Sequence, residues 1–236
     1  MNITFRPMTA KEAWGFLESR HRSFHSHLKH FGYKYDMFIP EHPAIREMYD
    51  QEDLTEEQLE KYRDIFINQI YDVKDLQRLD SVLEEEALPA LRLVVDVLAP
   101  MAEKWKVQFP NSVEIETTYG IGGSYWAEMS TIIFRMCRSF GKWFLPESIP
   151  GLLQHEFIHL LIEIPIIQKY NVPQGLKERI VDIIGFEYFN IPIQKRFDDS
   201  FANKYITKEA IENDLPGAVQ KMMLDYALIP DAVIPA

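Results

Sequence analysis

The sequence predicts an α+β fold that is mostly helical, with a small β-sheet beside one apolar helix. Three observations predict it. Amphipathic patterns of helical period fill most of residues 1–108, two short runs with strand-like alternation lie within 113–136, and a strongly apolar helical run follows near residue 150. The 236 residues are enough for one large domain or two small ones. We expect a helical N-terminal region, 1–108, packed on a second part, 109–236, that holds the strands and the apolar helix.

The N-terminal region is expected to hold three helical segments, over Thr9–His30, Thr55–Tyr71 and Asp75–Lys104. Thr9 with Glu12 three residues later has the pattern of a capping box. Pro89 is expected to bend or restart the last of these segments. Residues 31–50 show no clear period and are expected to be irregular.

Two strands are expected next, separated by a glycine-rich turn. Val113–Tyr119 alternates apolar and polar residues, as a half-buried strand does, and Ser130–Met136 is a second candidate. Between them, Gly120–Ser124 is expected to be a turn. It lacks the spacing of a phosphate-binding loop, and no lysine follows it, so we do not expect it to bind phosphate.

Three helices are expected in the remainder of the chain. The first begins at Ser148 and Pro150 and stops near Pro165. The second opens at Gln174–Gly175, and the last spans about Lys208–Leu228.

The first of these helices carries the sequence His155-Glu156-Phe157-Ile158-His159, an H-E-x-x-H motif. Residues four apart lie on the same face of a helix, so both imidazoles can reach a single ion. Two neutral imidazoles suit zinc, and the Glu156 carboxylate is near enough to act as a base toward a water on that ion. The alternative is a pair of core histidines on a buried helix.

A second motif, Glu178-x-x-x-Asp182, follows after 18 intervening residues. A catalytic zinc usually has three protein ligands and one open position, and Glu178 completes the set with His155 and His159. Asp182 lies one turn further along and is expected to accept the other ring N–H of a ligating histidine, most simply His155.

Together these two motifs resemble the gluzincin metallopeptidases, the group of thermolysin and the M1 aminopeptidases. The resemblance covers about residues 113–190. It implies a zinc-dependent peptidase in which Glu156 is the general base, acting on a peptide or protein substrate. It also implies an edge strand beside the active-site helix that binds the substrate backbone. The sequence does not show which of the two predicted strands is that edge.

In the resembling families a tyrosine or histidine donates a hydrogen bond to the developing oxyanion. No histidine follows His159, so the candidates are tyrosines and one arginine. We take Tyr205 and Tyr188 as the catalytic candidates; the others are Tyr119, Tyr170 and Arg196. No motif supports any of them. A non-cleaving peptide-binding or regulatory protein with the same zinc site is therefore the alternative, and a metal-free helical interaction domain is a third hypothesis.

A second histidine group consists of His21, His25, His27 and His30, of which His21 and His25 are four apart. Basic residues surround it and no carboxylate is near, so we expect a solvated helix face rather than a metal site.

The composition excludes several other classes of protein. A net charge of −11 disfavours nucleic acid as a partner, and no run is long and apolar enough to span a membrane. The single cysteine, Cys137, rules out an internal disulfide and suits a reducing compartment, so we expect a cytoplasmic protein. The oligomeric state is not predicted.

Overall fold

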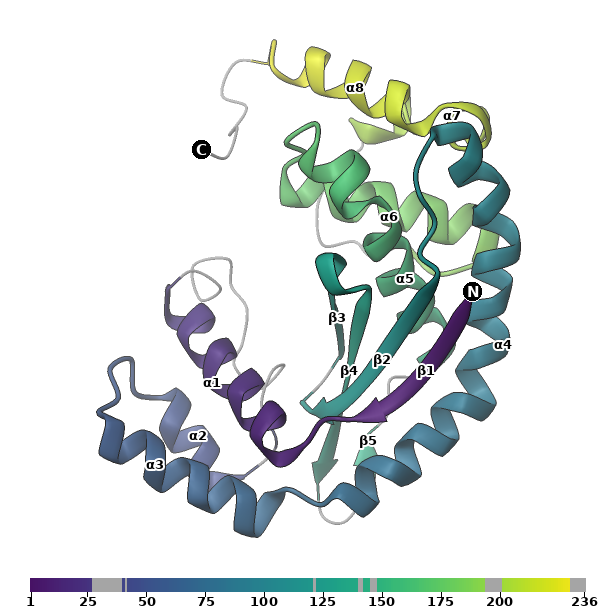
Figure 1. Cartoon of the computed structure of the whole chain (residues 1–236). Helices are drawn as coiled ribbons and strands as arrows, with labels where there is room; N and C mark the ends of the chain where they lie inside the picture. Colours follow the sequence, from purple (N-terminus) through teal and green to yellow (C-terminus); the bar gives the residue numbers. More distant parts are fainter. Residues whose placement is uncertain are drawn as a thin grey trace.

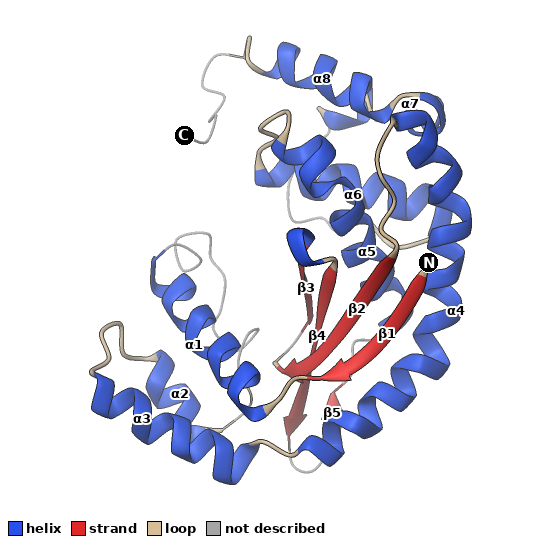
Figure 2. Ribbon diagram, viewed as in Figure 1, coloured by secondary structure: helices blue, strands red, loops and turns tan. Residues whose placement is uncertain are grey.

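The computed structural model describes residues 1–26, 40, 42–120, 122–139, 142–144, 148–193 and 201–229, with 137–139 and 142–144 described by their backbone alone. The architecture is α+β and mostly helical, as predicted, with a small mixed sheet among the helices (Figures 1 and 2). Helices α1–α3 gather at one end of the sheet and α6–α8 at the other (Figure 1).

The sheet has the strand order β1-β2-β4-β3. The two predicted strands are β2 (Ser112–Tyr119) and β4 (Thr131–Ser139), which pair in parallel. Strand β3 (Gly122–Trp126) returns antiparallel to β4 and lies at the edge of this order. A short strand, β5 (Lys142–Phe144), pairs with the end of β4.

The sheet corrects two predictions. Gly120–Ser124 is not wholly a turn, since β3 begins at Gly122. The turn is confined to its first residues, where Gly120 and Gly122 have positive φ values of 135° and 96°. Residues Asn2–Pro7 form a strand, β1, that the sequence pattern does not predict. It pairs in parallel with β2, placing Phe5 opposite Ile115. The sheet thus joins the region 1–108 to the region 109–236.

The helices at the N-terminal end follow their caps. Helix α1 (Ala10–Ser26) begins at the predicted capping box, in which the Thr9 N–H donates to Glu12 at 2.7 Å. Helix α3 (Glu56–Ile65) begins at a second box formed by Thr55 and Gln58, and runs on as a π-helical turn, η3 (Phe66–Ile70). Between them lies α2 (Pro43–Tyr49), so the prediction of irregular structure is wrong there. Pro43 supplies the preset φ of a first helical turn, and His42 caps it.

Helix α4 is a single helix, Val73–Trp105, that passes through Pro89 and Pro100 without ending. An interior proline removes a hydrogen bond and costs about 3 kcal/mol. A continuous buried stripe at helical spacing offsets that cost, formed by Leu76, Leu79, Leu83, Ala87, Leu91, Val94, Leu98, Ala102 and Trp105. The stripe packs against β1, β2 and α5.

The motif helix α5 (Ile149–Ile162) begins at Ser148, whose hydroxyl accepts the Gly151 N–H. It continues past Pro165 as a π-helical turn, η5 (Glu163–Gln168), rather than stopping at the proline. Helix α6 (Gln174–Phe189) starts as predicted. The predicted last helix is two helices, α7 (Lys208–Asn213) and α8 (Leu215–Tyr226), separated at Asp214, which caps α8. Two 3₁₀ turns complete the elements, η4 (Ala127–Met129) and η6 (Ala202–Lys204).

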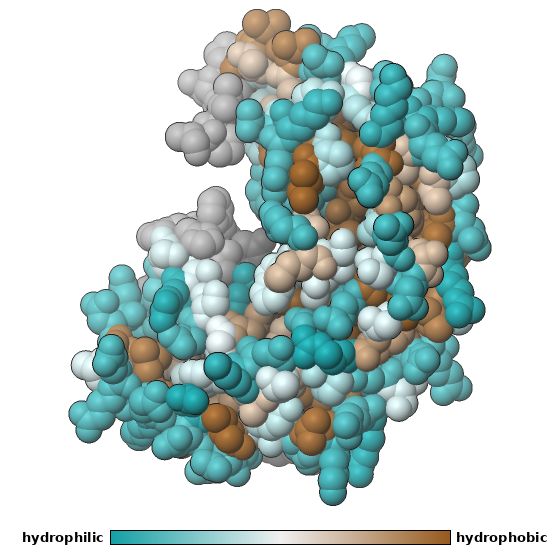
Figure 3. All heavy atoms as spheres, viewed as in Figure 1, coloured by the Kyte–Doolittle hydropathy of each residue, from teal (hydrophilic) through white to brown (hydrophobic). Residues whose placement is uncertain are grey.

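Hydrophilic side chains cover most of the face seen in Figure 3. Apolar side chains gather at its top, over the end of α8, where Leu224 and Leu228 are exposed. None of the helices that the structure describes combines the length and the hydrophobicity needed to cross a membrane.

One partly buried carboxyl, that of Asp80, gives stability a pH dependence. Asp80 of α4 accepts a hydrogen bond from the Thr117 hydroxyl at 2.7 Å, and burial raises the pKa of Asp80 to about 6. A raised pKa in the folded state means that its stabilising contribution is full below the ordinary value of 3.8 and is lost as pH rises through about 6. Asp80→Asn is therefore expected to raise the free energy of unfolding at pH 7.5 by about 1 kcal/mol, allowing for partial exposure.

Denaturant unfolding at several pH values tests this expectation. The advantage of Asp80→Asn should shrink as the pH falls from 7.5 toward 4.5, whereas Glu85→Gln, an exposed change on the same helix, should show no such trend. An advantage independent of pH would show that Asp80 does not titrate in this window.

Candidate metal centre

Helix α5 places the two histidines of the motif on one buried face. Leu153, Phe157, Ile158 and Leu161 are almost fully buried around it, so the helix is enclosed on nearly all sides. His155 is 6% exposed and His159 is 2% exposed. Their Nε2 atoms lie 3.0 Å apart, as expected for imidazoles four residues apart that point to one place.

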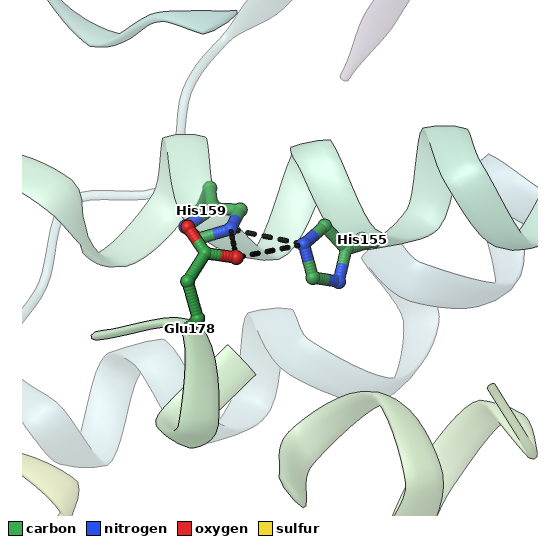
Figure 4. Close-up of side chains that lie close together, drawn as sticks. All are labelled: His155, His159 and Glu178. Carbon is green, nitrogen blue, oxygen red and sulfur yellow. Dashed lines mark hydrogen bonds and ion pairs between the residues drawn. The ribbon is translucent and has the colours of Figure 1, made fainter. Parts of the chain in front are cut away.

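Helix α6 brings Glu178 to the same point, and Figure 4 shows its carboxylate facing both imidazoles. Its Oε2 atom lies 3.5 Å from His155 Nε2 and 3.3 Å from His159 Nε2. Tetrahedral ligands at zinc distances of about 2.0–2.2 Å are separated by about 3.3–3.5 Å. The two distances to Glu178 therefore match the spacing around one four-coordinate ion, and the 3.0 Å between the two Nε2 atoms is a few tenths of an ångström shorter. Among the residues that the structure describes, this is the one group of three or more potential ligands.

The charges at this point favour an ionised Glu178 carboxylate. Burial disfavours the charged forms of both Glu178 and His155. Hydrogen bonds with the two imidazoles outweigh it for Glu178 and hold its pKa well below its usual range. For His155, the hydrogen bond and charge of Glu178, with Glu156 and Asp182 nearby, outweigh burial and raise its pKa. The carboxylate is thus stabilised by positive charge, which a divalent cation also supplies.

Asp182 lies one turn after Glu178 on α6 and is 4% exposed. Its Oδ1 atom is 3.9 Å from His155 Nδ1, the ring nitrogen that does not face Glu178. His155 is also the histidine that the motif spacing predicts as its partner. The distance is longer than a hydrogen bond, so its role as the acceptor for His155 stays a prediction.

Glu156 is buried against the edge strand β3. It is 8% exposed, and a Cβ atom placed on Gly123 would come within 2.6 Å of its Oε1 atom. Only glycine leaves room for the carboxyl at this point. The buried Arg135 of β4 donates a hydrogen bond to the carbonyl of Gly123 and so holds this stretch of backbone. A glycine inside a strand indicates such a close approach, a signal that was present in the sequence.

The edge strand beside the motif helix α5 is β3. Both strands predicted from the sequence, β2 and β4, lie inside the sheet with partners on each side. Helix α5 packs against β3 and β4. In the described part of the chain no strand pairs with the outer side of β3, which leaves backbone groups there for an added strand.

Tyr125 of β3 is a further residue at the site that the sequence motifs do not single out. Its ring stacks on the His159 imidazole, with centroids 5.0 Å apart and an interplanar angle of 11°. Its hydroxyl donates to Glu163 at 2.6 Å. Glu163 follows His159 by four residues, so helical spacing places Glu163 on the same face as the histidines. This spacing could have identified Glu163, but not Tyr125, from the sequence.

The tyrosines proposed as oxyanion donors form their hydrogen bonds elsewhere. Tyr188 donates to Glu212 at 3.3 Å, and Tyr205 donates to Asp225 at 2.7 Å. Burial, then the charge of Glu212, raises the pKa of Tyr188 to about 12. Tyr119 contacts the backbone of Asp72. None of these bonds involves the three ligand residues or Glu156, and the catalytic roles of Tyr188 and Tyr205 stay predictions. Arg196 lies outside the described residues.

The second histidine group is not a solvated face at His21, which is 4% exposed. His21 Nε2 lies 2.7 Å from the carbonyl of Gln51, and His25 Nε2 lies 2.9 Å from that of Tyr49. The prediction of a solvated face fails because the end of α2 lies beside α1, and the histidines of α1 contact backbone carbonyls at that end. The other two histidines of this group lie outside the described residues. The expectation that these two residues bind no metal is consistent with these carbonyl contacts.

Comparison with protein-family models, with curated proteins and with solved structures found no match to this chain. Any inference about its function therefore rests on the geometry of the site and on general chemistry.

Proposed function

We propose that this protein is a zinc-dependent metallopeptidase. The observation that carries the proposal is the convergence of His155, His159 and Glu178, whose three ligand atoms lie 3.0–3.5 Å from one another. The donor set favours zinc because two imidazoles and one carboxylate are the ligands of many hydrolytic zinc sites. When bound, zinc would lower the pKa of a water toward about 7 and polarise the scissile carbonyl.

The residues of the chain would then divide the work as in the gluzincins that the motifs resemble. His155, His159 and Glu178 hold the ion, and Asp182 orients His155. Glu156 follows His155 directly and accepts the proton of the attacking water, then passes it to the leaving amine. Its carboxyl is confined between α5 and Gly123, which supports this role because a general base must be held in position.

The open side of β3 supports a peptide or protein as the substrate. An extended peptide can add to an edge strand through its backbone N–H and C=O groups. Strand β3 carries Gly123 next to Glu156 and Tyr125 next to His159, so a peptide bound along it would run past both ends of the motif.

A non-cleaving peptide-binding or regulatory protein is the second candidate function. The observation that favours it is that Tyr188 and Tyr205 form hydrogen bonds away from the ligand residues. The two candidates share the zinc site and differ only in whether peptide bonds are hydrolysed.

Metal content and peptidase activity test the proposal together. Mass spectrometry is expected to find about one zinc ion per wild-type chain and none in the His155→Ala/His159→Ala double variant. A quenched-fluorescent peptide library should then be cleaved by the wild type, and a chelator should abolish cleavage reversibly. Zinc without cleavage would favour the non-cleaving protein. Absence of zinc, even after readdition, would leave the motif as a buried helix face.

A further inference from the structure

The two histidine ligands of the proposed zinc site have different surroundings at their second ring nitrogen. His155 Nδ1 faces the carboxylate of Asp182 at 3.9 Å. Within the described residues both Nδ1 atoms are buried without a hydrogen-bond partner, but His159 Nδ1 has no carboxylate facing it. A metal-bound histidine nearly always has an acceptor there, which fixes the tautomer and the orientation of the ring. Something else must fix the plane of the His159 ring.

We propose that Tyr125 is the positioning residue of His159 and sets the plane of its imidazole by ring stacking. The inference rests on the proposed zinc site. The two rings lie nearly parallel, at 11°, with their centroids 5.0 Å apart. Among the described residues, no other aromatic ring lies nearly parallel to a ligand imidazole; the His155 and His159 rings are tilted by 76° to each other. Rotation of His159 would break the stack as well as swing its Nε2 atom away from the other ligands.

Tyr125 can act as a fixed reference because its own hydroxyl is held by two further elements. It donates to Glu163 at the end of α5, at 2.6 Å. It accepts a hydrogen bond from Lys177 of α6 at 3.1 Å, and Lys177 also lies 3.7 Å from Glu163. The side chains of Lys177 and Glu163 are each 14% exposed, so this ion pair is poorly screened by solvent.

These contacts connect β3, the strand proposed to bind the substrate, to two of the proposed zinc ligands, His159 and Glu178. Tyr125 belongs to β3, stacks on His159, and contacts Lys177, which directly precedes the ligand Glu178. A displacement of β3 would therefore reach both ligand helices. Tyr125 is assigned a positioning role, not that of an oxyanion donor, because its hydroxyl is already donated to Glu163.

Zinc affinity, measured by competition with a chromogenic chelator, tests whether the ring of Tyr125 or its hydroxyl positions His159. Tyr125→Leu removes the ring and is expected to weaken zinc binding by about 10–100-fold, the usual cost of losing an outer-shell partner. Tyr125→Phe keeps the ring and should recover most of that affinity, to within about threefold of wild type. Trp126→Leu, at the next and more exposed aromatic residue of β3, is the matched control and should bind zinc as the wild type does.

The visible absorption spectrum of the cobalt-substituted protein gives a second measurement at the ligands. Tyr125→Leu should change its band positions, and Tyr125→Phe should not. If Tyr125→Leu does not fold, Tyr125→Met keeps the test open, since it fills much of the space without an aromatic ring and should weaken zinc binding by about the same 10–100-fold.

Three outcomes would count against these proposals. Wild-type affinity in Tyr125→Leu would overturn the positioning role alone. An equal loss of affinity in Tyr125→Phe would overturn stacking as the cause. A wild-type protein that binds no zinc would instead overturn the proposed function, so the two failures are distinguishable.

Discussion

Glu156→Gln is expected to retain zinc and to lower the rate of peptide hydrolysis by about 10²–10⁴-fold, the usual contribution of a general base. Glutamine has nearly the same shape, so it fits beside Gly123, but its amide cannot accept the proton of the attacking water. The measurement is kcat/KM on a cleaved peptide, with zinc content determined on the same sample. Near-wild-type hydrolysis with full zinc would refute the general-base role.

Gly123→Ala tests the same role from the other side of the contact. The added methyl group would meet the Glu156 carboxyl at 2.6 Å, so either the carboxyl or the strand must move. We expect a loss of kcat with little change in zinc content. Ser124→Ala, the next residue on β3, is the matched control because it adds no atoms. Equal activity in Gly123→Ala and Ser124→Ala would show that the position of the carboxyl does not limit the reaction.

Glu178→Ala is expected to weaken zinc binding by more than about 100-fold, beyond the cost of losing an outer-shell residue. The variant lacks the only carboxylate of the three-ligand group, and the two imidazoles remain as the protein's ligands. Thermal unfolding with increasing zinc measures this, because an ion that binds only the folded state raises Tm once its concentration exceeds its dissociation constant. The wild type should gain stability at zinc concentrations that leave the variant unchanged.

Two further variants on α6 give reference values for the zinc affinity of Glu178→Ala. Asp182→Asn should show a smaller loss of zinc affinity, about 10–100-fold, as expected for a residue that orients His155. Glu187→Ala, an exposed carboxylate on the same helix, should bind zinc normally. If Glu178→Ala bound zinc as tightly as Glu187→Ala, the third ligand would have to be another residue.

The sequence was sufficient to predict that the two candidate histidine ligands converge, because helical geometry relates them. His155 and His159 share a face through their spacing alone, and α5 is buried because it is apolar on nearly all sides. The arrival of Glu178 depends on how α6 packs against α5. Here the prediction rested on resemblance to a family whose spacing it shares, and the distances agree.

The contacts that β3 makes at the site were not predicted, because they depend on strand pairing. Gly123 and Tyr125 reach the site only because β3 pairs with β4, with Gly123 opposite Phe134 and Tyr125 opposite Ile132. The local sequence, Gly-Gly-Ser-Tyr-Trp, has two glycines and resembles a turn. Likewise, β1 is short, and its partner strand is remote in the sequence, so no local pattern marks it.

The pairing of β1 with β2 also bears on how the chain acquires its structure. Arg6 of β1 forms an ion pair with Glu116 of β2 across a separation of 110 residues. During synthesis, the first strand must wait for its partner while the whole of α4 and the helices before it are made. Such long-range parallel pairing slows folding and leaves an unsatisfied strand able to pair with other chains. Folding yield should therefore depend on protein concentration and on chaperones more than the high helical content would suggest.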